Sequence, residues 1–447
     1  MAFVIKRTIS YKSDQTNTSL TLPAIFTESG LLISYTRFLV RNYHKSASWK
    51  DKSCLSVRLL LQYINANGHC FSSSTELLRA FVLALRFGSI DKDGEDNSQL
   101  YWSPRKPKIA ANILHHITLY CDYVDEVSGE PSPLKNPLVA ATTAEVRLAW
   151  CAYYNKKKNI FLSHLSTPSP ENYQRSRMLK VPVDHLVDIE SAVRFPEEKF
   201  EAFLKSFTRK VTRTVEGRKI TSVEPDYCSQ LICLLMHFGG LRISECFHIY
   251  AHDVSFDLDK KQVIISVFHP EYGVAPEQNF SSRAEYLRLV YGLMPRNLYT
   301  KTSSMHAGWK NPLLSHKNYS FDVYFYPTNV AELFYQILRK YLEVRPSPAV
   351  GEEHPYLFSN QNGAPETIKN FEAKYRRALR RINLKQDKSN GLSPHGHRHS
   401  YGFRLRNAGF SQLEIQKAMH HKSIDSCLIY IVPTPDEVRK KMRTTDA

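Results

Sequence analysis

Four helical runs, with basic residues between their apolar positions, dominate residues 25–128 of the chain. Apolar side chains recur at helical spacing in LLISYTRFLVRNY, LSVRLLLQYINANG, STELLRAFVLALRFGS and KIAANILHHITLYCDYVDEV. The segment SGEPSPLKNP that follows is rich in proline, glycine and serine, as linkers are. We therefore expect a compact helical domain at residues 25–128, preceded by a polar segment at residues 1–24 with a short β-like stretch, TSLTLP.

The rest of the chain is too long to share that domain's core, because 447 residues usually divide into two or three domains. FPEEKFEAFLKSF, CSQLICLLMHFGG, SSRAEYLRLVYGL and VAELFYQILRKYLEVR have helical patterns, whereas KKQVIISVF and FDVYFYP alternate like strands. We expect a linker or insertion at residues 129–189, a second domain at 190–432 and a tail at 433–447. The expected fold class is mainly α with a small β-sheet (α+β).

The chain carries a large excess of positive charge. Sixty Lys and Arg residues stand against 43 Asp and Glu residues, which gives a formal net charge of +17. Such an excess favours a polyanionic partner, because cations that neutralise phosphates release condensed counterions. A basic protein without a nucleic-acid partner remains open on charge alone.

Cysteine spacing and hydropathy indicate a soluble, cytoplasmic protein. None of the eight cysteines has a C-x-x-C neighbour, so reduced thiols are expected and not a disulfide or zinc framework. The start, MAFVIKRTISYKSD, lacks the apolar core of a signal peptide, and no apolar run reaches membrane-spanning length. We expect no membrane partner.

Three separated clusters carry residues suited to phosphate chemistry. They are GGLRISE (239–245), PHGHRHSYG (394–402) and MHHKSIDSCLIY (419–430). An arginine, a His-x-x-Arg or a tyrosine at a helix end is common by itself and usually structural. Their combination in this order, in one strongly basic chain, favours a shared site.

These clusters resemble the three signature boxes of the tyrosine recombinases, or phage-type integrases. GLRISE resembles the first arginine box, HGHRHSYGFRLRNAG the His-x-x-Arg-His box, and MHHKSIDSCLIY the box that places a histidine nine residues before the nucleophilic tyrosine. The resemblance implies a helical core-binding domain that clamps DNA and a catalytic domain. It also implies a site-specific recombinase or integrase, an enzyme that cleaves and rejoins DNA through a 3′-phosphotyrosyl intermediate.

The residue types fit that chemistry. A phosphodiester under attack gathers negative charge on its non-bridging oxygens, and preorganised arginines stabilise that charge. Arg242 and Arg398 are the candidates, and Tyr430 is the candidate nucleophile. A tyrosyl phosphodiester keeps the energy of the broken bond, so rejoining needs neither ATP nor a metal, and no cofactor is expected.

The resemblance assigns further roles to histidines and a lysine. His395 would act as acid or base near the nucleophile, and His421 would donate a hydrogen bond to the phosphate. Glu245 is expected on the same helical face as Arg242, where it would orient a basic or histidine partner. The family also uses a lysine that protonates the leaving oxygen; here Lys310 is favoured, and Lys317 remains a secondary candidate.

Several alternatives stay open. His420 replaces His421 if the register differs by one, and His395, His397 and His399 resemble a metal cluster, although no acidic or cysteine ligand accompanies them. A DNA-binding protein that has lost catalysis, or a type IB topoisomerase-like enzyme that relaxes DNA, would share much of the pattern. A metal-dependent nuclease would need carboxylates clustered at the motifs.

The expected partner is double-stranded DNA, and the resemblance implies a homotetramer on two DNA sites. Accessory DNA-bending or element-encoded proteins and association with the nucleoid are further expectations of the same kind. The sequence gives neither the DNA target, nor the direction of reaction, nor the role of residues 129–189 and 269–320.

Overall fold

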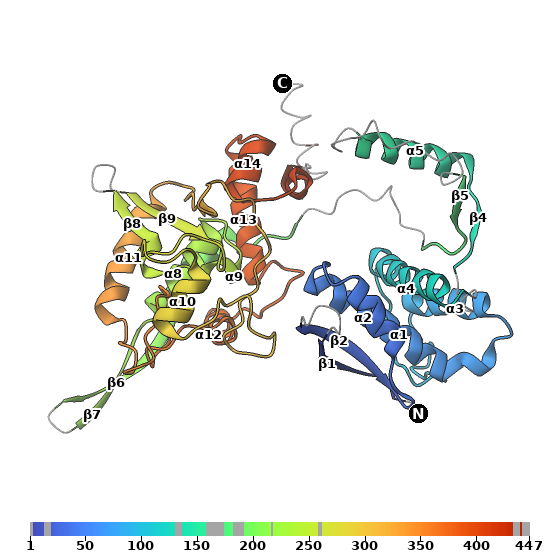
Figure 1. The fold of residues 1–447 in the computed structure, drawn as a ribbon. Helices are drawn as coiled ribbons and strands as arrows, with labels where there is room; N and C mark the ends of the chain where they lie inside the picture. Colours follow the sequence, from blue (N-terminus) through green and yellow to red (C-terminus); the bar gives the residue numbers. More distant parts are fainter. Residues whose placement is uncertain are drawn as a thin grey trace. The chain divides into compact units, whose positions relative to one another are not determined.

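The chain divides into two compact units, Met1–Val187 and Asp188–Ala447 (Figure 1). The computed structural model describes residues 3–12, 19–129, 136–157, 174–181, 192–215, 218–257, 262–431 and 439. Over these residues helices predominate and the sheets are small and antiparallel, which confirms the expected fold class. Among the helices described, none is both long and apolar enough to cross a bilayer.

The first unit contains the four helices that the sequence predicts. They are α1 (Ile33–Arg41), α2 (Ala47–Asn67), α3 (Ser74–Phe87) and α4 (Pro107–Ser128), with a 3₁₀ turn at Gly68–Cys70 after α2. Ser46 and Ser73 cap α2 and α3 by accepting backbone N–H groups, and a proline opens α4. The apolar faces of α2, α3 and α4 pack into one core.

A three-stranded sheet occupies the part of the chain that was expected to be a polar N-terminal segment. Its strands are β1 (Ile5–Lys12), β2 (Ser19–Thr27) and β3 (Gly30–Leu31), in the order β1-β2-β3. Leu22 and Ile25 of β2 are buried against α1 and α2. The β-like stretch in the sequence is thus part of a sheet that covers the helices.

Residues 129–189 contain regular structure where they are described. β4 (Leu138–Ala140) pairs antiparallel with β5 (Arg175–Arg177), and α5 (Thr143–Lys157) lies between them in sequence. The Asn136 side chain bonds the backbone of Leu179 through both its oxygen and its nitrogen, at 2.8 and 2.9 Å. The remainder of the expected linker and the expected tail at 433–447 lie almost wholly outside the described residues.

Helix α8 (Tyr227–His237) forms the centre of the second unit. Every residue from Cys228 to His237 is buried, because the sequence is apolar on all sides of the helix. It packs against α7, α9, α11, α12 and α13. The helices of this unit are α7 (Glu197–Lys205), α9 (Ile243–Cys246), α10 (Arg283–Tyr291), α11 (Val330–Val344), α12 (Ile368–Arg381), α13 (Pro394–Asn407), α14 (Gln412–Ala418) and α15 (Leu428–Ile431).

A second three-stranded sheet lies beside α11. β9 (Gln262–Phe268) pairs antiparallel with β8 (Val254–Asp257) and with β10 (Ser320–Asp322). The predicted strand FDVYFYP is therefore too long. After Val323, whose N–H still bonds Ile265, the backbone turns so that Tyr326 bonds Phe238 at the end of α8, and the following proline has no N–H to offer a sheet.

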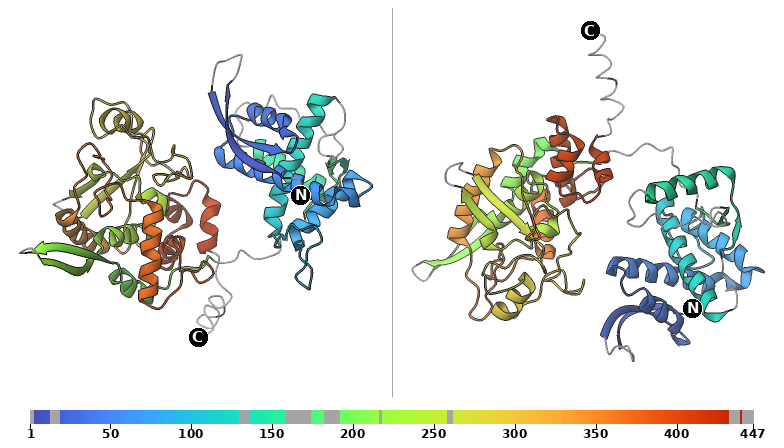
Figure 2. Two further views of the ribbon diagram at one scale, coloured as in Figure 1. Left: turned by 90° about the horizontal axis from the view of Figure 1, so that it is seen from below. Right: turned by 45° about the horizontal axis from the view of Figure 1, so that its top comes forward.

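A long β-hairpin was not predicted. β6 (Thr208–Val215) and β7 (Arg218–Pro225) pair from Thr208↔Pro225 to Val215↔Arg218. In all three views, the hairpin extends away from the helices of its unit (Figures 1 and 2). Its base contacts the core, where Phe207 is buried next to α7 and α12.

Candidate active site

A tight double-glycine loop delivers Arg242 to the start of α9. Gly240 has a φ of +67°, and a side chain there would enter the ring of Tyr401. Gly239 is equally crowded, since a Cβ would lie 2.6 Å from Val323 and 2.8 Å from the Leu235 carbonyl. The loop therefore needs glycine at both positions, and it sets Arg242 at the N-cap of α9.

Glu245 joins the two predicted arginines. Its carboxylate accepts the Arg242 backbone N–H at 2.7 Å and Arg242 Nη1 at 2.6 Å, and it lies 3.8 Å from Arg398 Nη1. Glu245 is fully buried and Arg398 is 1% exposed, whereas the Arg242 side chain is 25% exposed. The carboxylate thus holds Arg242 in place while leaving it accessible to a ligand.

We expect Glu245→Gln to lower the free energy of unfolding by about 3 kcal/mol, because it leaves the buried charge of Arg398 uncompensated. Urea unfolding followed by circular dichroism measures this. Glu201→Gln is the matched control, since Glu201 pairs with Lys205 on the exposed face of α7 and should leave the midpoint nearly unchanged. Equal midpoints for both variants would show that Glu245 does not stabilise the arginines.

Arg398 connects the three sequence clusters. It lies on α13, and its guanidinium donates to the carbonyl oxygens of Gly240 and Met419, which belong to the first and third clusters. Burial lowers the pKa of Arg398 to about 10, so the side chain stays charged at neutral pH. Two of its five N–H donors bind these carbonyls, which leaves others for a phosphate.

A cavity of about 380 Å³ collects four of the predicted residues. Arg242, Arg398, His395 and Lys310 line it, together with Leu241, Ile243, Ser244 and Pro394. Lys310 is exposed, and within the described part of the chain its ammonium has no hydrogen-bonding partner. Lys317 is exposed as well, but it does not line this cavity.

Tyr430 lies next to this group and not in the cavity wall. It is 1% exposed on α15, and its hydroxyl lies 3.0 Å from His399 Nδ1. The ring packs on Gly402, where a Cβ would come within 2.9 Å of it. Burial raises the pKa of Tyr430 to about 12, although Arg398 and Arg242 act in the opposite direction.

The histidines of the third cluster have different surroundings. The ring of His421 lies nearly parallel to that of Tyr430 at 6.1 Å, and its Nδ1 contacts Cys427 Sγ at 3.3 Å. His420 instead stacks on Phe321 at 3.9 Å, with a φ of +54°, and its ring nitrogens have no partner among the described residues. The geometry favours His421 over His420 as the histidine next to Tyr430.

The three histidines around Arg398 point to different partners. His395 lines the cavity and contacts His399 with ring centroids 4.3 Å apart, and His399 reaches Tyr430. His397 is fully buried, with its nitrogens 3.0 Å from His237 Nδ1 and from the Tyr375 hydroxyl. Because His397 points away from the other two, the three rings do not converge on one metal position.

His399 is a site residue to which the sequence motifs gave no role of its own. They placed it only in the histidine cluster, with His395 as the acid or base near Tyr430. Its position directly after Arg398 and one helical turn after His395 is a signal that places it on the same side of α13. The structure puts His399 between His395 and the tyrosine hydroxyl.

Buried histidines are expected to make the second unit sensitive to acid. Burial lowers the pKa of His421 and of His399 from 6.5 to about 3. Below pH 6.5 the unfolded chain binds protons that the folded chain does not, so stability should fall as the pH falls from about 6.5, by up to about 1.4 kcal/mol per pH unit for each histidine.

Urea unfolding at several pH values measures this dependence. We expect His421→Asn to reduce the slope of stability against pH. His252→Asn, at an exposed histidine of the same unit, should leave the slope unchanged. An unaltered slope in His421→Asn would contradict the assignment of His421 as a buried neutral group.

Comparison with known proteins gives a family match for the second and third clusters. Residues 326–437 match the family model described as "Phage integrase family". Over this segment the chain is similar to the phage integrase family. The matched segment contains His395, Arg398, His421 and Tyr430, whereas Arg242 and Lys310 precede it.

One curated relative is similar to part of the chain. Tyrosine recombinase XerD of Corynebacterium glutamicum is 32% identical over 109 residues, which is 24% of this chain and 34% of that protein. The match therefore spans about a third of the relative's length.

Among solved structures, XerA recombinase is similar at 14% identity and a TM-score of 0.34, over 93% of this chain and 98% of that chain. XerH recombinase bound to a palindromic difH substrate is similar at 12% identity and a TM-score of 0.46. That likeness covers 89% of this chain and 80% of the XerH chain.

Proposed function

We propose that the chain is a site-specific DNA recombinase that cleaves and rejoins DNA through a covalent bond to Tyr430. The observation that carries the proposal is the convergence of Arg242, Lys310, His395 and Arg398 on one cavity beside the Tyr430–His399 pair. Residues far apart in sequence supply cations for a phosphate, a tyrosine hydroxyl and a proton acceptor. A tetramer on two DNA sites, with accessory proteins, belongs to the same proposal.

In the proposed reaction, a DNA phosphate enters the cavity and its non-bridging oxygens accept hydrogen bonds from Arg242 and Arg398. His421, next to the Tyr430 ring, donates a further hydrogen bond. These donors stabilise the charge that develops as the nucleophile attacks. Because Glu245 holds Arg242 and the helix α13 holds Arg398, little reorganisation is needed when the phosphate binds.

The proton and bond changes balance within these residues. The Tyr430 oxygen forms a bond to phosphorus as its proton passes to His399 Nδ1, which is 3.0 Å away and neutral. The bond from phosphorus to the 5′-oxygen breaks, and Lys310 donates a proton to that oxygen. The reverse steps rejoin the strand, with the 5′-hydroxyl as the nucleophile.

Since the Tyr430 hydroxyl is buried, α15 must shift when DNA binds. Helix α15 is four residues long and follows the 3₁₀ turn Ile424–Cys427 directly, so this turn is where the shift would begin. The His395–His399 contact then links the cavity to the tyrosine.

The test of the proposed function is covalent trapping. The purified protein is incubated, with a chelator and without ATP, with nicked duplexes drawn from the DNA that surrounds its own coding sequence. We expect a protein–DNA band that survives denaturation. Tight binding without any covalent band would contradict the proposal and favour a DNA-binding protein that has lost catalysis.

Lys310 has its own test, because a sulfur leaving group needs no protonation. We expect Lys310→Ala to slow cleavage of ordinary DNA by about 10²–10⁴-fold. On a substrate with sulfur in place of the bridging 5′-oxygen, the variant should cleave as fast as the wild type, since a thiolate has a much lower pKa than an alkoxide. Lys317→Ala is the matched control and should be normal on both substrates; the opposite pattern would make Lys317 the acid.

A further inference from the structure

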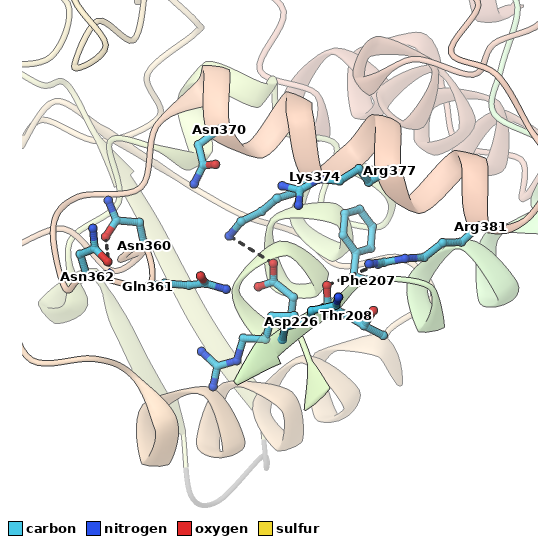
Figure 3. A pocket seen from close by; sticks show the side chains of 12 residues that line it. Phe207, Thr208, Asp226, Asn360, Gln361, Asn362, Asn370, Lys374, Arg377 and Arg381 are labelled. Atoms are coloured by element: carbon cyan, nitrogen blue, oxygen red, sulfur yellow. Dashed lines mark hydrogen bonds and ion pairs between the residues drawn. The ribbon is translucent and has the colours of Figure 1, made fainter. Parts of the chain in front are cut away.

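A second cleft, distinct from the candidate active site, lies between the β6–β7 hairpin, α12 and the turn at residues 360–363. It has a volume of about 540 Å³ (Figure 3). Its lining residues are Phe207, Thr208, Arg209, Lys210, Asp226, Asn360, Gln361, Asn362, Asn370, Lys374, Arg377 and Arg381. None of these lines the cavity at Arg242.

The cleft is predominantly cationic. Lys374 forms ion pairs with two carboxylates, Asp226 at 3.1 Å and Glu366 at 2.8 Å. Among the lysines and arginines of the lining, it alone is paired with two carboxylates in the described structure. Arg377 and Arg381 donate hydrogen bonds to backbone carbonyls. Because a carbonyl carries no net charge, these bonds do not compensate the positive charges of the two guanidinium groups. Lys210 is exposed at the rim. The lining thus offers several positive charges against the single carboxylate of Asp226.

Arg209 gives a second, independent indication of a ligand. Its side chain is only 17% exposed, and its Nε is buried without a hydrogen-bonding partner among the described residues. The nearest carboxylate contact is Glu224, at 3.9 Å from Nη2. Within the described residues, the Arg209 guanidinium is thus only loosely paired, and it adds a further positive charge to the lining of the cleft.

The architecture holds these cations in fixed positions. Asn370, Lys374, Arg377 and Arg381 follow one side of α12, as Figure 3 shows, while Phe371 and Tyr375 of the same helix are buried in the core. Arg381 Nη1 bonds the Ser206 carbonyl at 2.7 Å and so fixes the base of the hairpin to α12. The turn opposite is held by the Asn360 side chain, which accepts the N–H groups of Asn362 and Ala364.

We propose that this cleft holds a backbone phosphate of duplex DNA, outside the phosphate at the scissile position. The proposal rests on the proposed function, since it takes DNA as the substrate. Duplex DNA fits better than an acidic protein, because Phe207 is the lone apolar side chain of the lining and protein interfaces need a more apolar centre. Arginine, lysine and amide side chains are those that contact DNA phosphates.

The hairpin would extend the contact along the DNA. Its strands pair from Thr208↔Pro225 to Val215↔Arg218, and it extends away from the helices of its unit in Figures 1 and 2. The cleft at its base would hold one phosphate firmly, and the rest of the hairpin would follow the backbone. The hairpin and cleft would therefore raise affinity without reading bases.

The test measures how DNA affinity depends on salt. The full chain is titrated against a duplex of fixed sequence at several NaCl concentrations, for the wild type, Lys210→Gln/Arg377→Gln and Arg209→Gln. We expect the slope of log affinity against log salt to become less steep by about 0.9 for each phosphate that the variant no longer neutralises. The control Arg339→Gln/Lys340→Gln removes the same charge from an exposed part of α11 and should keep the wild-type slope.

Wild-type slopes in both cleft variants, or an equal change in the α11 control, would overturn the proposal. The proposal would also be overturned if the wild type bound poly-glutamate and the cleft variants did not, while the salt dependence of their DNA binding stayed normal. Covalent trapping at saturating protein separates this proposal from the function itself. The cleft variants are expected to form the covalent complex. If the wild type does not form it, while the cleft variants still show a less steep salt dependence of DNA binding, the recombinase proposal is overturned and the cleft remains a DNA site.

Discussion

Replacing Tyr430 with phenylalanine is expected to abolish the covalent protein–DNA complex completely. The substitution removes the oxygen that is proposed to attack phosphorus and keeps the ring that packs on Gly402 and beside His421. The absence of the hydrogen bond to His399 should lower the free energy of unfolding by only about 1 kcal/mol. A denaturing gel measures the covalent product, and fluorescence anisotropy measures DNA affinity.

Binding should be unchanged in this variant, which separates chemistry from recognition. Tyr401→Phe is the matched control, because Tyr401 is equally buried, lies on α13 and donates its hydroxyl hydrogen to the Tyr324 carbonyl, away from His399. We expect Tyr401→Phe to form the covalent complex. A covalent band in Tyr430→Phe would mean that another residue is the nucleophile.

Replacing Arg398 with glutamine is expected to reduce the rate of strand cleavage by about 10²–10³-fold or more. The reduction has two causes. The variant lacks the charge that is proposed to stabilise the phosphate in the transition state. It also lacks the two hydrogen bonds from Arg398 to the carbonyls of Gly240 and Met419, which link the first and third clusters. It also leaves the buried Glu245 without one of its two cations.

Arg398→Lys distinguishes the two causes. Lysine keeps the charge near Glu245 but has a single nitrogen, so it cannot bond both carbonyls and a phosphate as a guanidinium does. We expect Arg398→Lys to be more stable than Arg398→Gln in urea and still strongly impaired in single-turnover cleavage. Normal cleavage by Arg398→Lys would show that charge alone is sufficient at this position.

The helices were readily predicted from sequence, whereas of the strands only β9 was predicted well, because KKQVIISVF alternates and is β-branched. Helices α1–α4, α7, α8, α10 and α11 have local signals, namely apolar periodicity together with caps such as Ser73 or Pro107. The β6–β7 hairpin alternates threonine and valine with arginine and lysine, so it lacks the apolar face that marks a half-buried strand. The first sheet was reduced to one stretch for the same reason: β1 is largely exposed.

The site was predictable where a motif fixes a residue's role, and not where packing does. Arg242, His395 and Arg398 come from local motifs, and the choice of Lys310 over Lys317 agrees with the cavity that the fold forms. His399 contacts Tyr430 because Gly402, which has no side chain, lets the tyrosine ring pack directly against α13. The spacing of residues in the sequence does not reveal this contact. The burial of the hydroxyl and the basic cleft at α12 likewise depend on tertiary packing.

The proposed chemistry is tested most sharply by locating the DNA on the protein. The trapped complex is digested with a protease and a nuclease, and the modified peptide is sequenced by mass spectrometry. We expect the nucleotide on Tyr430, joined through a 3′-phosphate, with a free 5′-hydroxyl on the released strand. A nucleotide on any other residue, or a 5′-phosphate linkage at Tyr430, would contradict the proposed site and its chemistry.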